Sequence, residues 1–313
     1  MSAADPLAYP MRRHGMDHDR YAWSMLADRA PLRWPCDKPL AVWVNLCLEH
    51  FPLDPRGEGF KPHGAMTMPY PDLRHYTLRD YGNRVGVFRV LDAIAACGLQ
   101  ASVAVNAELV GRYPALARAL RQTSHEWVGH GWNMDSVHHG GMAADEEARL
   151  IERSLDALRE ASAGRIRGWL SPARSQSHAT PDLLRAAGIE WCADWVNDEL
   201  PYRFETAHGP LVNLPLPLEL EDRFVIGENL HAESEWADQC IDAFDFLLEE
   251  ASRLGSGRLL ALNLHAWVIG QPHRMKHLER VLAHVAGHRD QVFNATPSAI
   301  VDAAAMLTER TLA

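Results

Sequence analysis

Cysteine is scarce in this sequence, and its few residues lie far apart. The 313 residues include five cysteines, none of them in a Cys-x-x-Cys pair. A disulfide framework needs an even and denser set, and a structural zinc–thiolate site needs closely spaced pairs. We therefore expect free thiols in a reducing compartment.

Long hydrophobic runs are missing as well. No apolar stretch approaches the roughly 18 residues that a membrane-spanning helix needs, and residues 1–20 are polar. A secretory signal would place an apolar core in that region. The sequence therefore predicts a cytoplasmic protein that neither crosses nor binds a membrane.

The sequence also lacks an excess of positive charge. Its formal net charge is -10 at pH 7, whereas proteins that bind phosphate backbones carry clustered Lys and Arg. Nucleic acid is therefore not an expected partner. What is present is ordinary globular composition, with 47% hydrophobic and 23% charged residues, which predicts a chain that folds on its own.

Apolar strand patterns alternate with helical periodicity along the chain. The first strand pattern, Leu40–Leu48, is almost continuously apolar, as in strands of a parallel sheet that is covered on both faces. Six further strand patterns follow. Five lie at 100–106, 166–170, 190–194, 211–216 and 259–264, and a short one ends at residue 130. Helical patterns lie at 84–97, 114–121, 145–161, 180–188, 238–254, 275–287 and 298–307. This alternation indicates βα units, and we expect an α/β barrel.

No internal repeat or long linker divides the chain. We expect an irregular N-terminal arm over residues 1–38, which wraps the barrel or a neighbouring subunit, and a single barrel domain over residues 39–313. A length of 313 residues suits one barrel of this kind.

Titratable residues stand where several of the expected strands end. They are Glu49, His50, His130, Asp194 and His265. In parallel α/β folds the carboxyl ends of the strands surround one mouth, so these groups should converge there. A carboxylate or neutral His near water can act as a general base, a second group can protonate a leaving amine, and His can hold a Lewis-acidic metal. One such His is more often a core residue, but their coincidence favours a site.

Aromatic residues and one arginine lie close to the same strand ends. Trp132, Trp195 and Tyr202 are expected to wall a substrate pocket, although core packing would explain them equally well. Arg174, in the sequence Ser-Pro-Ala-Arg, is expected to bind a carbonyl or carboxylate, with a surface ion pair as the alternative.

The order and spacing of four segments resemble a known family. They are 81–106 (YGNRVGVFRVLDAIAACGLQASVAVN), 126–135 (EWVGHGWNMD), 168–202, which begins GWLSPARSQ, and 262–285, which begins LNLHAWVIG. The sequence resembles the polysaccharide deacetylase superfamily (NodB homology, carbohydrate esterase family 4), and within it the bacterial allantoinase and cyclic-imide-hydrolase-like branch. The resemblance covers residues 40–306 and implies a distorted (β/α) barrel with about seven parallel strands.

The metal site of the carbohydrate deacetylases is altered in this sequence. There an Asp-Asp pair follows the first strand, base first and metal ligand second, and a His-x-x-x-His pair completes the site. Here Glu49 stands at the base position, His50 and His130 at ligand positions, and Met134 replaces the second His. A thioether is a poor ligand for the metals that amide hydrolysis uses. The cofactor implied is therefore either one divalent metal, zinc first among them, or none.

The allantoinase-like branch has Glu in the first motif, His-Gly-Trp in the second and a segment like Asp198–Tyr202 here. The resemblance thus implies hydrolysis of a non-peptide carbon–nitrogen bond in a small cyclic ureide, imide or amide. It places Glu49 at the position of the general base. We expect His265, near the end of the last strand, as general acid or oxyanion stabiliser, and Asp198 as a third catalytic residue. Relatives of this branch are often symmetric oligomers, so we also expect a homo-oligomer.

Two other functions stay open at this point. One is N-deacetylation of an N-acetylated carbohydrate, against which the lost second His and the absent export signal argue. The other is a catalytically inactive homologue that binds a small molecule.

Overall fold

The computed structural model describes residues 17–54, 71 and 73–311, with backbone alone over 306–311. Within these residues nine strands form one curled sheet in the order β6-β7-β5-β4-β3-β2-β1-β8, and β9 pairs with β1. The strands are β1 Leu40–Leu48, β2 Ser102–Val105, β3 Glu126–Gly129, β4 Gly168–Trp169, β5 Trp191–Cys192, β6 Tyr202–Phe204, β7 Leu211–Asn213, β8 Arg258–His265 and β9 Val292–Asn294. Each pairing is parallel except that of β6 with β7.

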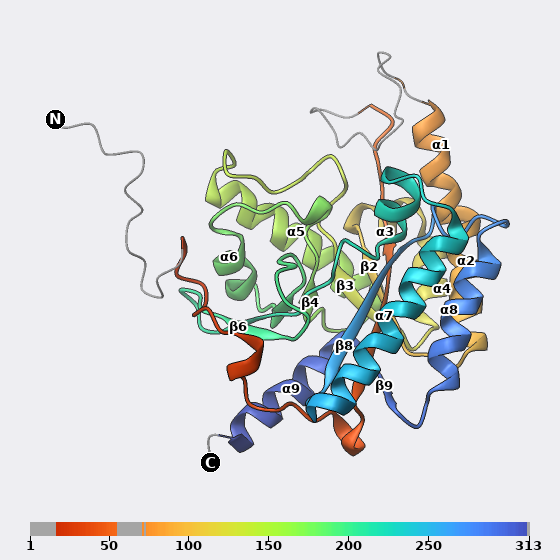
Figure 1. Ribbon diagram of the computed structural model, residues 1–313. Coiled ribbons are helices and arrows are strands. Elements are labelled where there is room, and N and C mark those ends of the chain that lie inside the picture. The colour runs from red at the N-terminus through yellow and green to blue at the C-terminus, as the bar shows by residue number, and fades with distance from the viewer. Residues whose placement is uncertain (1–16, 55–70, 72, 312–313) are drawn as a thin grey trace, which may run out of the picture.

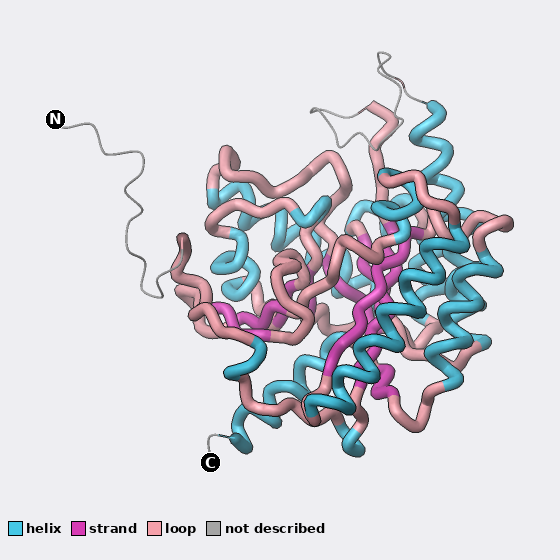
Figure 2. The backbone as a smooth tube through the Cα atoms, in the orientation of Figure 1, coloured by secondary structure: helices cyan, strands magenta, loops and turns pink. Residues whose placement is uncertain are grey.

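Helices cover the outside of this sheet (Figure 1; Figure 2). They are α1 Leu73–Tyr81, α2 Val87–Ala96, α3 Ala107–Arg112, α4 Pro114–Arg121, α5 Ala144–Ser162, α6 Thr180–Ala186, α7 Glu233–Leu254, α8 Met275–Gly287 and α9 Pro297–Thr311. The core lies between these helices and the strands, and every residue of β1 and β8 is buried. Apolar periodicity produces this arrangement because it gives the longer helices, such as α5, α7 and α8, one face that must be removed from water.

The register of the central strands brings their carboxyl ends to one edge. Cys47 of β1 lies opposite His265, the last residue of β8, and Val105 of β2 lies opposite Gly129, the last residue of β3. The residues that follow β1 and β3 therefore emerge beside the end of β8, which is where parallel sheets place their sites.

The expected distorted barrel is confirmed, as a half-barrel whose end strands β6 and β8 do not pair with each other. The count of about seven strands was too low, because β6 and β9 were not expected. Each has three residues, which is too short to show a periodicity. Helix α1 was also missed, since its sequence has no clear apolar face.

The described part of the expected N-terminal arm packs on its own chain. The Arg20 guanidinium forms an ion pair with Asp182 at 2.7 Å, and Trp34 is 1% exposed, with its indole N–H donating to the Arg258 carbonyl at 2.7 Å. Residues 1–16 of the arm lie outside the described residues.

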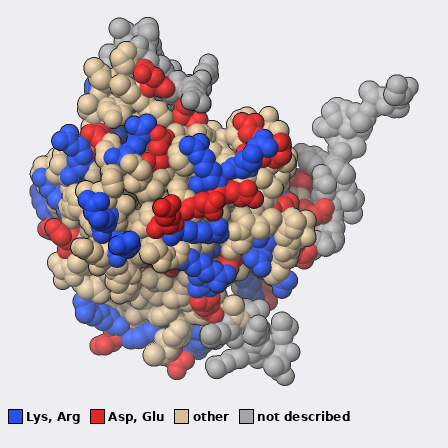
Figure 3. Space-filling model, turned by 180° about the vertical axis from the view of Figure 1, so that it is seen from behind, with Lys and Arg blue, Asp and Glu red and all other residues tan. Residues whose placement is uncertain are grey.

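The molecular surface mixes charges of both signs. Figure 3 shows acidic side chains lying between basic ones over the back of the molecule. In the described part of the chain, no helix has both the length and the apolar character needed to span a bilayer.

Candidate active site

A small cavity of about 40 Å³, lined mostly by buried residues, lies at the carboxyl ends of the central strands. Its lining residues come from β1, β8 and the segments that follow β1, β3, β4 and β7. They are Cys47, Glu49, His130, Met134, Leu170, Ser171, Ala173, Arg174, Glu221, Arg223, Asn263 and His265. The structure thus brings together four of the residues expected at the site, namely Glu49, His130, Arg174 and His265.

Glu49 follows β1 and is 5% exposed. The indole N–H of Trp267 donates to its Oε2 at 2.8 Å, and its Oε1 lies 3.8 Å from Nε2 of His265 and 3.9 Å from Nε2 of His130. Burial alone would raise the pKa of Glu49, but His265, His130 and the indole together hold that pKa well below its ordinary value. Glu49 is therefore a carboxylate at neutral pH.

Asp222 holds the ring of His265. The His265 Nδ1 lies 2.8 Å from Asp222 Oδ1, and the backbone N–H groups of His265 and Ile269 donate to Asp222 Oδ2 at 2.9 and 3.2 Å. This arrangement leaves the His265 Nε2 facing Glu49 and Glu221. Burial would lower the pKa of His265, but the carboxylates of Glu49 and Glu221 raise it well above its ordinary value. His265 is therefore an imidazolium, able to donate a proton from Nε2.

His130 follows β3 and presents its other nitrogen to the cavity. Its Nδ1 lies 2.7 Å from the Leu170 carbonyl, which can only accept, so Nδ1 carries the proton. Its Nε2 is buried and has no hydrogen-bond partner among the described residues. His130 therefore presents Nε2 to the cavity, beside Glu49, where a ligand or a water molecule can bind it.

Glu221 is the anionic centre opposite Glu49. Arg174 pairs with its Oε2 at 2.7 Å and Arg223 with its Oε1 at 2.8 Å, while the His265 Nε2 lies 3.7 Å from Oε1. Burial would raise the pKa of Glu221, but Arg174, His265 and Arg223 lower it to about 2.

A chain of buried polar side chains fixes the wall beneath Glu221. Asn263 donates to Glu221 at 3.1 Å and accepts from Asn45 at 2.7 Å. Ser102 in turn donates to Asn45 at 2.7 Å and accepts from Trp43 at 2.8 Å. Because every member has its partner, this network costs little to bury and orients Glu221.

A tight turn after β4 carries Arg174 to the cavity. Asp194, at the end of β5, accepts from the Ser171 backbone N–H at 2.6 Å and from its hydroxyl at 2.9 Å. Ala173 and Arg174 then adopt positive φ angles of 54° and 52°, which non-glycine residues rarely do. The Arg174 Nε is buried and has no hydrogen-bond partner among the described residues, so a donor is available for a ligand.

His50 does not line this cavity. Successive side chains of a strand point to opposite faces, so Cys47 and Glu49 share the cavity face and His50 does not. Its Nε2 lies 3.8 Å from Glu108, and its backbone N–H donates to Asn106 at 2.7 Å. Burial lowers the pKa of His50. The expected pairing of His50 with His130 as metal ligands stays a prediction.

Three other expected site residues lie against the N-terminal segment instead. Trp195 and Tyr202 pack their rings on Tyr21, with centroids 5.9 and 4.9 Å apart. Asp198 forms an ion pair with Arg29 at 2.6 Å. None of the three lines the cavity, because the segment after β5 leads away from it to β6.

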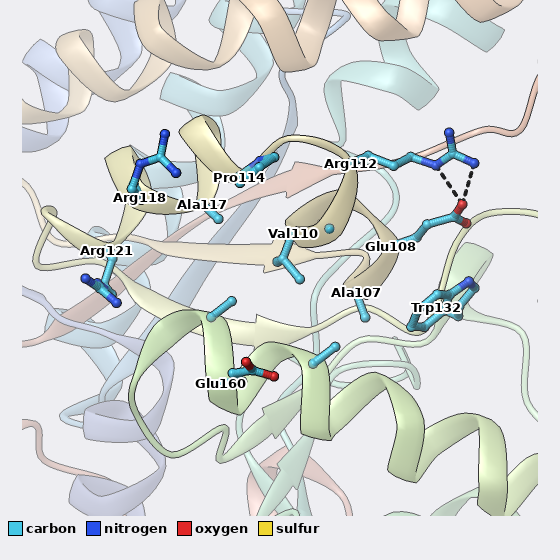
Figure 4. Close-up of a pocket in the computed structure, with 13 residues that line it drawn as sticks. Ala107, Glu108, Val110, Arg112, Pro114, Ala117, Arg118, Arg121, Trp132 and Glu160 are labelled. Atoms are coloured by element: carbon cyan, nitrogen blue, oxygen red, sulfur yellow. Dashed lines mark hydrogen bonds and ion pairs between the residues drawn. The ribbon is translucent and has the colours of Figure 1, made fainter.

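Trp132 lies beside the cavity rather than in it. It lines a surface hollow of about 650 Å³ between α3, α4 and α5. Figure 4 shows Trp132 at the end of this hollow opposite Arg121, next to the ion pair of Glu108 with Arg112. The guanidinium of Arg153 lies over the Trp132 ring, 3.5 Å from its centroid.

The donors around the cavity do not fit a three-ligand divalent metal site. His130 Nε2 and Glu49 are suitable ligands, but Glu221 is occupied by two arginines and the His265 ring is cationic and bonded to Asp222. Burial raises the pKa of the Cys47 thiol, so it is not a ready thiolate ligand. Within the described residues no group of three His, Cys, Asp or Glu side chains is placed to hold a metal ion.

Sequence reasoning missed several groups of this site, namely Glu221, Asp222, Arg223 and Trp267. Glu221 and Asp222 follow β7 by eight or nine residues and precede a π-helical turn at Arg223–Glu228, so a search at strand ends passes over them. The acidic pair itself was the available signal. Trp267 lies two residues beyond the end of β8, where a tryptophan is equally typical of a core.

Comparisons with known proteins identify relatives of this chain. Residues 75–192 match the family model described as polysaccharide deacetylase. A Schizosaccharomyces pombe protein, provisionally described as a polysaccharide deacetylase, is 23% identical over 270 residues, which cover 79% of this chain and 83% of that protein.

Two solved structures share the fold over most of the chain. A probable polysaccharide deacetylase from Pseudomonas aeruginosa PAO1 superposes with a TM-score of 0.78 at 26% identity, covering 88% of this chain and 94% of that chain. The structure of Puue Allantoinase gives a TM-score of 0.78 at 24% identity, with the same coverage of 88% and 94%; this likeness concerns the fold.

Proposed function

We propose that this chain, of which residues 75–192 match the polysaccharide deacetylase family model, hydrolyses a non-peptide carbon–nitrogen bond in a small cyclic ureide, imide or related amide. The observation that carries the proposal is the convergence of Glu49, His130 and His265 on one cavity. Each of the three residues is at most 5% exposed, and the cavity has a volume of about 40 Å³. A space of this size admits a carbonyl group and a water molecule, and suits a small molecule better than a link inside a polymer.

The charge states of the resting site are those that an acid–base pair requires. Glu49 is ionised and can accept a proton from water as the water oxygen attacks the carbonyl carbon. His265 is protonated and can give the Nε2 proton to the leaving nitrogen as the C–N bond breaks. The free Nε donor of Arg174 suits the developing oxyanion, and the unpartnered Nε2 of His130 suits a hydrogen bond with the substrate or with the attacking water.

The two proton transfers support each other electrostatically. The imidazolium of His265 lowers the pKa of Glu49, which makes Glu49 a weak base before the reaction. When His265 donates its proton, the positive charge of the imidazolium is lost. The pKa of Glu49 then rises, which favours Glu49 keeping the proton that it has taken from water. We therefore expect removal of either group to disable both transfers.

N-deacetylation of a carbohydrate is the second candidate. A hollow of about 910 Å³ shares Met134 with the cavity, and a second of about 650 Å³ shares Trp132 with the first; either has room for sugar rings. This candidate differs from the first in substrate alone, since the scissile bond is again an amide.

A substrate panel with matched inactive protein tests the proposal. Purified protein and its Glu49→Gln variant should be assayed on allantoin, succinimide, hydantoin and N-acetylglucosamine oligomers, before and after chelation, together with elemental analysis. We expect ring opening that the variant lacks. Acetate release from the oligomers alone would replace the first candidate by the second, and no turnover of any amide, with ligands still raising the melting temperature, would indicate an inactive binding homologue.

Metal content decides how the site works. Chelator-resistant turnover without bound metal would agree with a donor set that does not fit a divalent ion. About one equivalent of zinc, with activity lost on chelation, would show instead that the side chains around His130 rearrange to hold it.

A further inference from the structure

A groove of about 910 Å³ lies against the outer side of the catalytic cavity. It runs between the end of α3, the loop after β3 and the start of α5, and Glu108, Trp132, Met134, Arg149 and Arg153 are among its lining residues. Met134 also lines the catalytic cavity. It is 3% exposed, and its backbone N–H donates to the His50 carbonyl at 2.9 Å, so its position is fixed. The Met134 side chain thus forms a partition between the two spaces.

The groove lining carries four carboxylates and three arginines, and the three arginines differ in their partners. Arg112 pairs with Glu108 at 2.6 Å and Arg149 with Asp145 at 2.9 Å. Arg153 makes no hydrogen bond or ion pair with any described residue, and its guanidinium instead stacks on Trp132. Stacking of this kind leaves the edge of the guanidinium free to bind a carboxylate through two N–H donors.

We infer that this groove receives the non-reacting part of the substrate, that Met134 limits the size of the group that passes into the catalytic cavity, and that Arg153 on Trp132 attracts a carboxylate carried by that part. The inference rests on the proposed function, whose scissile bond must reach Glu49. It names the substrate class more narrowly, as an anionic amide or ureide with a small reacting end.

Cys47 gives a measure of access that needs no turnover. It lines the catalytic cavity and is buried, so a thiol reagent must enter the cavity to reach it. Cys192 is also buried but does not line the cavity, and it serves as the internal control. Labelling by methyl methanethiosulfonate, which is neutral, and by sulfonatoethyl methanethiosulfonate, which is anionic, is followed at each cysteine by peptide mass spectrometry. The thiol sulfur forms a disulfide with the reagent, and methanesulfinate leaves.

Two variants test the two parts of the inference. Met134→Ala should raise the ratio of Cys47 to Cys192 labelling about tenfold for both reagents, because local opening is no longer required, whereas Met134→Leu, which keeps the volume, should leave it near the wild-type value. Arg153→Gln should slow Cys47 labelling by the anionic reagent about threefold, as expected for one exposed charge, and leave the neutral reagent unaffected.

An unchanged Cys47 to Cys192 ratio in Met134→Ala would overturn the partition. Equal effects of Arg153→Gln on labelling by the two reagents, or no effect on either, would overturn the anionic subsite. Because Arg153 lies on the surface, this variant can still be tested if Met134→Ala does not fold. If the labelling results contradict the inference but amides are still hydrolysed, the proposed function stands. If labelling is as expected but no amide is turned over, only the proposed function is contradicted.

Discussion

Replacing Asp222 by Asn should disable the acid of the site while leaving its shape almost unchanged. The Asp222 carboxylate accepts hydrogen bonds from His265 Nδ1 and from the backbone N–H groups of His265 and Ile269. An Asn offers one oxygen to these donors and turns an NH₂ group toward at least one of them. Hydrogen bonds to charged groups contribute about 1.5–3 kcal/mol each, so we expect a loss of about 2–3 kcal/mol in the free energy of unfolding.

The larger effect should be on catalysis. Without the buried negative charge the pKa of His265 falls, and the ring is no longer fixed with Nε2 toward Glu49. Positioned acid catalysis contributes about 10²–10⁴-fold, so kcat/KM should fall by that order and its alkaline limb should move to lower pH. Activity against pH and urea unfolding check both expectations.

The chain offers a matched control for this substitution. Asp245 pairs with Nε2 of His284 at 2.7 Å, but its side chain is 55% exposed. Asp245→Asn should therefore change the free energy of unfolding by less than about 1 kcal/mol and leave kcat/KM unaltered. If Asp222→Asn is no more harmful than this control in either assay, the assignment of Asp222 as the residue that positions His265 is wrong.

Three further outcomes follow from the charges of the site. Glu49→Gln should lower kcat by about 10²–10⁴-fold with little change in melting temperature, and full activity would exclude Glu49 as the base. Arg174→Gln should raise the pKa of Glu221 and destabilise the fold by about 1–3 kcal/mol, whereas Arg174→Lys should recover part of that loss in urea unfolding. Activity should persist through neutral pH and fall on the alkaline side, because Glu49 stays ionised and His265 loses its proton only above its ordinary pKa of 6.5. The free energy of unfolding should depend on pH through the same groups. The stabilisation from His265 is fully present below pH 6.5 and is lost as pH rises through its raised pKa. The stabilisation from Glu221 is present above pH 4.5 and is lost as pH falls toward about 2.

The strand ends of this protein were largely readable from its sequence, because buried parallel strands are continuous apolar runs. The predicted strand Leu40–Leu48 and helix 275–287 have the bounds that the structure shows. Once the strands are known, parallel pairing requires that the residues after β1, β3 and β8 meet at one edge. Glu49, His130 and His265 were found in this way. The three-residue strands β6 and β9 were not found, because neither lies in a longer apolar run, whereas β7, of the same length, lies in the run 211–216.

Side-chain direction was the part that the sequence left open. Glu49 and His50 both follow β1, and only the alternation of the strand, continued from Cys47, tells which one faces the cavity. Trp195 and Tyr202 looked equally suited to a pocket, yet their rings pack on Tyr21 of the N-terminal segment, a partner about 170 residues away in sequence. Contacts of that range depend on the folded chain and have no local signature.

The acidic pair Glu221–Asp222 shows why a site built on charge is harder to predict than one built on ligands. Metal ligands recur at fixed spacings, whereas a carboxylate that balances charge needs only to arrive near its partners, and this pair arrives from a loop. Both members raise the pKa of His265. Asp222 in addition fixes the ring through Nδ1, and Glu221 faces Nε2 and holds Arg174 at the cavity. The positive charge that keeps Glu49 ionised therefore comes from His265, whose own charge depends on this pair. It follows that Glu221→Gln, although Glu221 itself was not expected from the sequence, should shift the alkaline limb of activity to lower pH as Asp222→Asn does, but without the loss of ring orientation.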